Sequence, residues 1–404
     1  MTTTTARFSL LVMTAASALL AAGCTNTAPA DRSGGDVVLL RLATIDGQIN
    51  SNGQGYGPEA FVRALNKVSD GRLRVQVATS YDDGLADAET RLVAAIASGK
   101  VDGGWPATRA FSAAGIHGLE AVEAPMMLTS HAALADLVTG SAAATALDGL
   151  RGSGVRGLAL AEGSLRRPFT SRHALLDPAD WRGVSFRAFN SPVQEDTIRA
   201  LGGTPADVGI AWLDQVKAGS LDGAEFDIAQ YAASGDTTEA GHVATNVVLW
   251  PKVFVLSLSQ KRYDTLTAQQ RGWVGQAASK ARDASVAGTY DDDARVRDLC
   301  RRGVVFLEAS QRQLARLRSS VAPVVAALDE DDRTRPLMRE VAAIAAKYPD
   351  PDVPSVPDGC DSARINPVSN VPSQRAGIPD GVYRVSIPSS TIQAAGAPDG
   401  PGFS

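Results

Sequence analysis

The hydrophobic pattern at the start of the chain alternates between strand-like and helix-like segments. Residues 37–45 form a dense apolar run that suits a strand covered on both faces. A helix with one apolar face begins near Pro58 and ends at Gly71. It is followed by a strand at 73–78, a helix at 87–98 and a turn at 99–102 that leads into a third strand. This β-α-β-α-β order predicts a parallel sheet, so Asn50 and Trp105 are expected near its ligand-binding edge.

The middle of the chain is organised around residues 181–227. The pattern predicts a short strand, a helix that ends in a double glycine, a helical turn and a second strand. Arg187 stands between Phe186 and Ala188 in the first of these strands, which otherwise has a buried composition. Because an unpaired buried charge costs several kcal/mol or more, Arg187 needs an anionic partner. We predict a ligand carboxylate; a structural ion pair is the alternative.

The remaining periodic segments surround this stretch. A long helix is expected from Thr267, where Gln270 completes a capping box, and it is expected to run toward Asp298 and span two lobes. Strands broken at Pro251 are expected in 245–260. The other expected elements are an extended segment at 123–128, strands at 155–161 and 304–308 and helices at 311–328 and 337–348. Residues 165–171 are expected to open the second lobe. Beyond Asp350 the periodicity fades, and we expect a partly disordered extension.

The first two dozen residues have the pattern of a secretion signal. Arg7 precedes an apolar run at 8–22, which is short for a membrane span, and small residues lead into Cys24. A cysteine at this place resembles a bacterial lipoprotein cleavage site, although Ala21 occupies a position where leucine is commonest. We therefore expect acylation of Cys24, a tether after it, and a protein that works outside the cytoplasm, anchored to the cell envelope by lipid. An ordinary secretory peptide with an incidental cysteine is the alternative.

Two cysteines remain, Cys300 and Cys360. In an oxidising compartment two leftover thiols most often pair. We predict a disulfide that joins the C-terminal extension to the body, with two free buried thiols as the alternative.

Composition and motifs exclude several kinds of function. The 404 residues suffice for two sizeable cores, and a net charge of −5 does not favour nucleic acid or an anionic membrane surface as a partner. Four histidines lie without metal-ligand spacing, and the chain contains no HExxH, GxSxG or CxxC motif. The glycines of residues 53–57 follow a predicted strand, but the GxGxG spacing and a bulky Tyr56 favour a flexible rim loop over a nucleotide site. We expect no metal, no cofactor and no enzymatic activity.

Three consecutive segments resemble the core signature of the solute-binding proteins of TRAP transporters, the DctP-like family. They are SFRAFNSP, RALGGTPADV and VKAGSLDGAEFD. The flanking segments LVAAIASGKVDGG, RPFTSRHALLDPADWRG and VLSLSQKRYDTLTAQQ resemble the family in the same order. The resemblance extends over roughly residues 37–348.

The resemblance implies a two-lobed, periplasmic-binding-protein-like α/β fold with a hinge cleft and a long interdomain helix. The implied boundaries are a signal peptide at 1–23, a tether at 24–36, one lobe at 37–163 with 246–285, a second lobe at 164–245 with 286–349, and the extension at 350–404.

The resemblance also assigns ligand-binding positions. The family's carboxylate-binding arginine falls on Arg187 and its second arginine on Arg167. The asparagine that often follows the family's Asp-Gly-x-Glu turn is here Phe226, which favours an apolar organic acid over a sugar acid. Trp105, Asn50 and Asn190 are further candidates for the ligand site, by position.

The function implied is that of a receptor that captures a small carboxylate and delivers it to the membrane subunits of a TRAP-type transporter. Two alternatives remain open. The same receptor can serve as a sensor that docks on a signalling protein. An extracytoplasmic hydrolase on a similar scaffold would require a nucleophile–base pair or a metal cluster, and neither is evident in the sequence.

Overall fold

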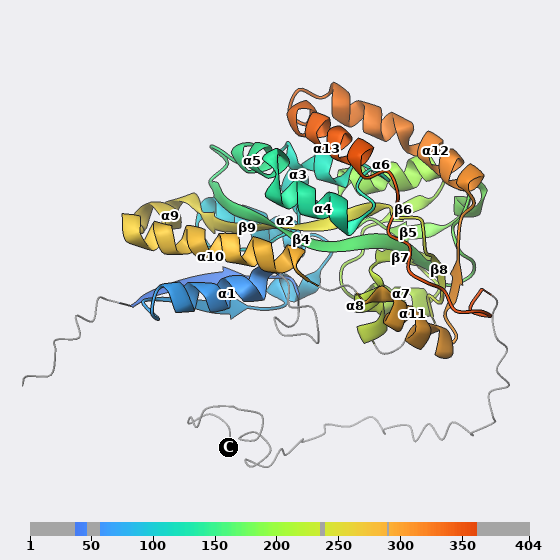
Figure 1. Ribbon diagram of the computed structural model, residues 1–404, viewed down its shortest axis with the longest axis horizontal. Coiled ribbons are helices and arrows are strands. Elements are labelled where there is room, and N and C mark those ends of the chain that lie inside the picture. The colour runs from blue at the N-terminus through green and yellow to red at the C-terminus, as the bar shows by residue number, and fades with distance from the viewer. Residues whose placement is uncertain (1–36, 47–56, 235–238, 289–290, 362–404) are drawn as a thin grey trace, which may run out of the picture. The chain divides into compact units, whose positions relative to one another are not determined.

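The structure is a computed structural model that describes residues 37–46, 57–234, 239–288 and 291–361 (Figure 1). Its first part contains the predicted parallel sheet. Strand β1 (Val38–Ala43) lies between β2 (Leu73–Ala78) and β3 (Gly103–Gly104), and α1 (Gly57–Val68) and α2 (Ala88–Ser98) connect them. The strand is not covered on both faces as predicted, because Leu39 is 40% exposed. We call the part built on β1, β2 and β3 the first half.

Two long antiparallel strands join this sheet to the rest of the molecule. Strand β4 (Val155–Thr170) pairs with β9 (Trp250–Ser259) as far as Arg166, and β4 then continues beside β7 (Gly223–Phe226) and β8 (His242–Ala244). The strand predicted at 155–161 is therefore longer than expected and continues to Thr170, with a register shift around Gly163. Strand β9 likewise runs through Pro251 without a break.

The second half is built on β7 and the parallel strands beside it. Strand β5 (Ser185–Arg187) pairs with β7 and with β6 (Thr204–Ala206), while β10 (Val305–Leu307) pairs with β8. Its helical segments are η3 (Pro178–Trp181), α6 (Pro192–Leu201), α7 (Trp212–Lys217), α8 (Ile228–Ala233) and α11 (Asp292–Arg301). Across both halves the strand order is β2-β1-β3-β9-β4-β7-β5-β6, which is a mixed α/β sheet.

Helix α10 (Ala268–Val286) is shorter than predicted. Its N-terminus has the predicted capping box between Thr267 and Gln270. The helix ends at Val286, with Ala287 as its C-cap residue, and does not continue toward Asp298. It packs on α1, α4 and β4, which places it on the first half (Figure 1).

The other helices complete the layers on the sheet. Helix α12 (Gln311–Glu330) packs on α6, and α13 (Arg335–Lys347) packs on α4 and α5 (Figure 1). The predicted lobe boundaries stay a prediction, although α13, expected in the second lobe, contacts elements of the first half. Residues predicted to be extended at 123–128 begin instead with the end of a 3-10 turn, η2 (Leu119–Glu123). The remaining elements are η1 (Tyr81–Gly84), α3 (Ala110–Ala113), α4 (His131–Thr139), α5 (Ser141–Asp148) and α9 (Gln260–Thr265).

Residues 349–361, which we call the strap, contact both halves. Asp352 donates its N–H to the carbonyl oxygen of Thr129 at 3.0 Å, and Arg167 Nη2 donates to the carbonyl oxygen of Asp352 at 2.7 Å. Cys360 forms a disulfide with Cys300, the predicted pairing, with the two Cα atoms 5.5 Å apart. Residues 362–404 lie outside the described residues. In the described part of the chain, no helix combines the length and apolar character that crossing a membrane requires.

Candidate functional site

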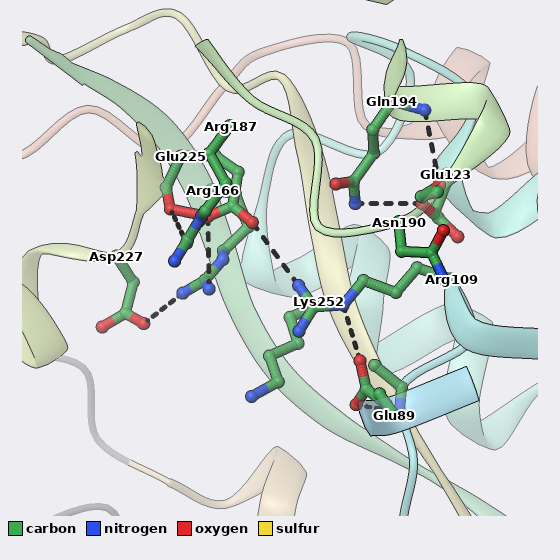
Figure 2. A network of polar contacts seen from close by, with 12 residues as sticks. Glu89, Arg109, Glu123, Arg166, Arg187, Asn190, Gln194, Glu225, Asp227 and Lys252 are labelled. Atoms are coloured by element: carbon green, nitrogen blue, oxygen red, sulfur yellow. Dashed lines mark hydrogen bonds and ion pairs between the residues drawn. The ribbon is translucent and has the colours of Figure 1, made fainter. Parts of the chain in front are cut away.

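Arg187 is buried at the end of β5, as its sequence context predicts, and its nearest anion is a protein carboxylate. Its side chain is 2% exposed. Nη2 donates to Glu225 Oε2 at 2.6 Å and to the carbonyl oxygen of Glu225 at 2.8 Å (Figure 2). Glu225 comes from β7, which pairs directly with β5. The buried cation therefore has a structural ion pair.

Glu225 is shared by three arginines from three different elements. Arg166 of β4 places Nη2 3.4 Å from Glu225 Oε2, and Arg109, just before α3, places Nη1 3.4 Å from Glu225 Oε1. Burial alone would raise the pKa of Glu225, but the charges of Arg166, Arg187 and Arg109 outweigh it and lower the pKa. Glu225 is thus a carboxylate held ionised at the centre of a cationic cluster.

A second layer of carboxylates neutralises the outer ends of the cluster. Arg109 Nε donates to Glu89 Oε2 at 2.7 Å, and Arg166 Nη1 donates to Asp227 Oδ2 at 2.9 Å (Figure 2). Both carboxylates are buried, so these pairs are shielded from solvent screening. They fix the two arginines that flank Glu225.

Lys252 of β9 adds a fourth buried cation. Its Nζ lies 3.5 Å from Asp46 Oδ1 and 4.6 Å from the centre of the Phe254 ring. Burial lowers the pKa of Lys252, and Asp46 opposes this shift. Asp46 is much more exposed than the carboxylates that pair with the three arginines.

Aromatic rings cover the guanidinium groups. The centre of the Phe226 ring lies 5.4 Å from Cζ of Arg187, and the Phe189 ring lies 5.1 Å from it. The Trp212 ring is 5.5 Å from the same atom. Cation–π attraction favours these positions, and the rings give the arginines an apolar surround. A molecule bound here would meet charge and aromatic surface together.

The arginines keep donor capacity that the described residues do not use. Nε of Arg187 and Nε of Arg166 are buried without a hydrogen-bond partner among the described residues. Burial lowers the pKa of Arg187 to about 10 against the opposing effect of Glu225, so the group stays charged at neutral pH. A guanidinium with free N–H groups can donate further hydrogen bonds to carboxylate oxygens in its plane.

The cluster lies where the two halves meet. Arg109 of the first half reaches Glu225 of the second. Beside this contact Asn190 Nδ2 donates to Thr90 Oγ1 at 3.1 Å. The carbonyl oxygen of Gly84 accepts from the N–H of Ile210 at 2.9 Å. The arginines are therefore enclosed by elements of both halves.

The structure brings some of the predicted site residues together and separates others. Arg187 and Phe226 are in contact, and Asn190 lies at the meeting of the halves. Trp105 is 3% exposed in the apolar core with Phe61, and it is not among the residues around Arg187. Asn50 lies outside the described residues.

Arg167 is buried on the opposite face of β4 from Arg166. Its Nε donates to the carbonyl oxygen of Thr245 at 2.7 Å, and Nη2 donates to that of Asp352. Because successive side chains of a strand point to opposite faces, Arg166 and Arg167 cannot both reach Glu225. The structure brings Arg166, not Arg167, to the cluster around Arg187.

Sequence reasoning missed Arg166, Glu225, Arg109, Glu89 and Lys252. One signal was available, because Glu225 is a lone carboxylate in a strand-like segment as Arg187 is a lone cation. Nothing comparable marked Arg109, whose place depends on contacts between distant segments. Within the described ranges, no three histidine, cysteine, aspartate or glutamate side chains are grouped so that they could hold a metal ion.

A family model and a known protein both identify the chain as similar to bacterial solute-binding proteins. The family model for bacterial extracellular solute-binding proteins, family 7, also called DctP, matches residues 44–331, more than half of the chain. A solute-binding protein from Verminephrobacter eiseniae is 24% identical over 285 residues, which cover 69% of this chain and 81% of that protein.

Solved structures of the same fold are similar over most of their length. A TRAP periplasmic solute-binding protein from Ralstonia eutropha H16 with bound (S)-2-acetolactate has a TM-score of 0.69 and 21% identity, covering 77% of this chain and 99% of that one. The sugar acid binding protein of Advenella mimigardefordensis in complex with galactonate has a TM-score of 0.67 and 20% identity, with coverage of 77% and 99%. The chain belongs to family 7 of the bacterial extracellular solute-binding proteins, a family of receptors, and it has the two-lobed α/β fold of the TRAP solute-binding proteins.

Proposed function

We propose that this protein captures a small organic acid outside the cytoplasm and delivers it to a TRAP-type membrane transporter. The ligand carboxylate binds Arg187 where the two halves meet. The observation that carries this proposal is a buried guanidinium, charged at neutral pH, whose Nε has no partner among the described residues. A guanidinium fork recognises a carboxylate through parallel hydrogen bonds.

The ligands of the structural neighbours support a carboxylate. (S)-2-Acetolactate and galactonate are both small acids. They differ in the rest of the molecule, so the shared group is the one that a common arginine would bind. From the ligands of these neighbours, we carry over to the present protein only the carboxylate group.

Arg166 is proposed as the second arginine of the site in place of Arg167. Arg166 shares Glu225 with Arg187 and has its own unpartnered Nε. The donors of Arg167 are directed at backbone carbonyl groups instead. A carboxylate that lies against Arg187 would therefore meet Arg166 first.

The body of the ligand is proposed to be apolar, branched or aromatic. Phe226 stands where the family often has an asparagine, and Phe189 and Trp212 lie with it around Arg187. The two phenylalanine rings offer no hydrogen bonds to hydroxyl groups, and a polyhydroxylated acid would lose water against them without replacement. The aromatic rings around Arg187 therefore favour an apolar acid over a sugar acid.

Calorimetry against defined acids tests the proposal. The panel contains (S)-2-acetolactate, galactonate, isovalerate and benzoate, titrated into the purified protein. Arg187→Ala should weaken binding of the best acid by at least about 30-fold, because truncating one partner of a buried charge pair costs about 2–5 kcal/mol. Arg301→Ala, a change of the same kind at a position 70% exposed, should leave the affinity unchanged. Equal affinity of the Arg187 variant and wild type would refute the proposed site.

Anchoring through Cys24 is a separate proposal that rests on the sequence of the first 24 residues. Cells grown with labelled palmitate should transfer the label to the wild-type protein and not to Cys24→Ser. Uptake of the bound acid by cells with and without this protein tests the transport step. Label in the serine variant would contradict the anchor.

A further inference from the structure

Glu123 is a buried carboxyl group that links the two halves beside the arginine cluster. It is the last residue of η2 and is 1% exposed. Its Oε2 accepts from Ser191 Oγ at 2.9 Å and from Gln194 Nε2 at 3.0 Å (Figure 2). Ser191 caps the N-terminus of α6, and Gln194 lies in its first turn. The contact therefore fastens α6 of the second half to η2 of the first.

Both partners of Glu123 are neutral, which distinguishes it from the other buried carboxylates. Among the described residues it is the only buried carboxylate with no ion pair within 4.0 Å. The others are Glu89, Glu120, Glu162, Glu225 and Asp227, and each pairs with an arginine or a histidine. A buried carboxylate without a cationic partner is costly, and taking up a proton removes that cost.

We propose that Glu123 carries a proton when the two halves are together, and that closing of the receptor takes up this proton. The inference rests on the proposed function, because closing is how the receptor would hold its ligand. It adds a regulation of the same site: the closed arrangement is favoured at low pH and is weakened as the pH rises.

Glu123 acts on the ligand site through the segment that it holds. Ser191 follows Phe189 and Asn190, both of which have positive φ. The Phe189 ring lies against Arg187, and Asn190 binds Thr90 across the halves. Releasing Ser191 from Glu123 frees the segment that places these two side chains. Glu123 is thus a positioning residue and does not itself bind the ligand.

The charged groups around Glu123 are engaged elsewhere. Arg109 is the cation whose field reaches Glu123, but it donates to Glu89 and Glu225. Glu120, on η2 itself, binds His117 Nδ1 at 2.7 Å. Strand β9 and helix α13 pack against η2, and their charged side chains also have other partners. Ion pairs join Lys252 to Asp46, Arg335 to Asp332 and Lys347 to Asp136, and Glu340 accepts a hydrogen bond from Ser141.

The electrostatics agree with this geometry and give the sign of the pH effect. Burial raises the pKa of Glu123 from 4.5 to about 8, with the hydrogen bond from Ser191 and the charge of Arg109 opposing the rise. When α6 withdraws from η2 the carboxyl group meets water and ionises in its ordinary range. The closed form therefore binds the proton more tightly, and raising the pH from about 5 to 8 favours the open form by up to about tenfold per pH unit.

Small-angle X-ray scattering of the ligand-free protein between pH 5 and 9 tests the proposal. The wild-type radius of gyration should increase as the pH rises between about 5 and 8. Glu123→Gln, which has no proton to lose, should keep a constant radius over the same range. Glu195→Gln makes the same change on the solvent side of α6 and should follow the wild type.

Gln194→Met keeps the test decisive if Glu123→Gln does not fold. Loss of the Gln194 donor removes a hydrogen bond that holds the closed form and that stabilises the ionised carboxylate most, so the closed form is weakened and the opening should move to lower pH. A wild-type radius that does not depend on pH, or the same profile in wild type and Glu123→Gln, or an unmoved midpoint in Gln194→Met would overturn the inference. Because no ligand is added, this result is independent of whether any acid binds at Arg187.

Discussion

Glu225 is the residue that allows three arginines to be buried in one place. Its two carboxylate oxygens lie within 3.4 Å of nitrogens from Arg109, Arg166 and Arg187. At such distances the mutual repulsion of the arginines is large in a medium of low polarity, and a shared anion compensates it. The internal carboxylate therefore sets how much positive charge remains for a ligand.

Glu225→Gln should destabilise the fold by roughly 3–5 kcal/mol at neutral pH, because it leaves buried cations without their shared partner. Urea unfolding followed by circular dichroism measures this change. Asp298→Asn is the matched control, since Asp298 also binds two arginines but is 49% exposed, and its loss should cost less than about 1 kcal/mol.

The effect of Glu225→Gln should also depend on pH. The folded state lowers the pKa of Glu225, so its contribution to stability is complete above the ordinary pKa of a glutamate and is lost as the pH falls through the folded value. The difference between wild type and variant should therefore shrink as the pH falls below about 4.3, the ordinary pKa of a glutamate. A difference that grows in acid would contradict this account.

At the scale of elements, local pattern was enough to place several elements of the first half. Strand β2, the start of α1 and the capping box of α10 lie where the sequence predicts them, because alternation, glycine and capping residues act over a few positions. Pattern failed where an element depends on its partners. Strand β4 continues past Gly163 because β9 runs along it, and no local signal contains that pairing.

In the candidate site, too, local pattern predicts some features, while others depend on contacts between distant segments. The burial of Arg187 followed from its apolar neighbours, but its partner Glu225 required the pairing of β5 with β7. Because side chains alternate along a strand, Arg166 and Arg167 point to opposite faces of β4. Only the pairing of β4 with β7 determines which of them faces Glu225. Trp105 was expected in the site and lies in the core, since an isolated aromatic residue fits either place equally well.

Strand β3 offers a prediction about element packing, since its two glycines fit between β1 and β9. A Cβ atom on Gly103 would lie 2.3 Å from the carbonyl oxygen of Ser257, which is backbone and cannot move aside cheaply. Gly103→Ala should therefore destabilise the protein by about 1–3 kcal/mol or more. Gly275→Ala in α10, where a Cβ atom meets nothing within 4 Å, should instead stabilise it by about 0.5–1 kcal/mol. Thermal unfolding of both variants measures whether each substitution lowers or raises the stability. A Gly103 variant as stable as the wild type would contradict the packing argument.

At the scale of the whole molecule, the strap ties the end of the described chain to both halves. Asp352 accepts from the N–H of His131 in the first half and from Arg167 of β4. Further along, Ser355 donates to Asp293 at 2.8 Å, and Cys360 forms the disulfide with α11 of the second half. The strap therefore crosses from one half to the other, and the disulfide fixes its far end.

Breaking this disulfide should lower the stability of the whole body. The bridge closes a loop with a sequence separation of 60, for which the chain-entropy estimate is about 4 kcal/mol. Cys360→Ser should lower the urea midpoint of unfolding by a corresponding amount, and Cys300→Ser and the double variant should match it, because all three remove the same bond. In the presence of a reductant, the urea midpoint of the wild type should fall to the same value. The midpoints of the variants should not change when the reductant is added. A wild-type midpoint that does not change on reduction would mean that the strap is held by its hydrogen bonds and not by the covalent link.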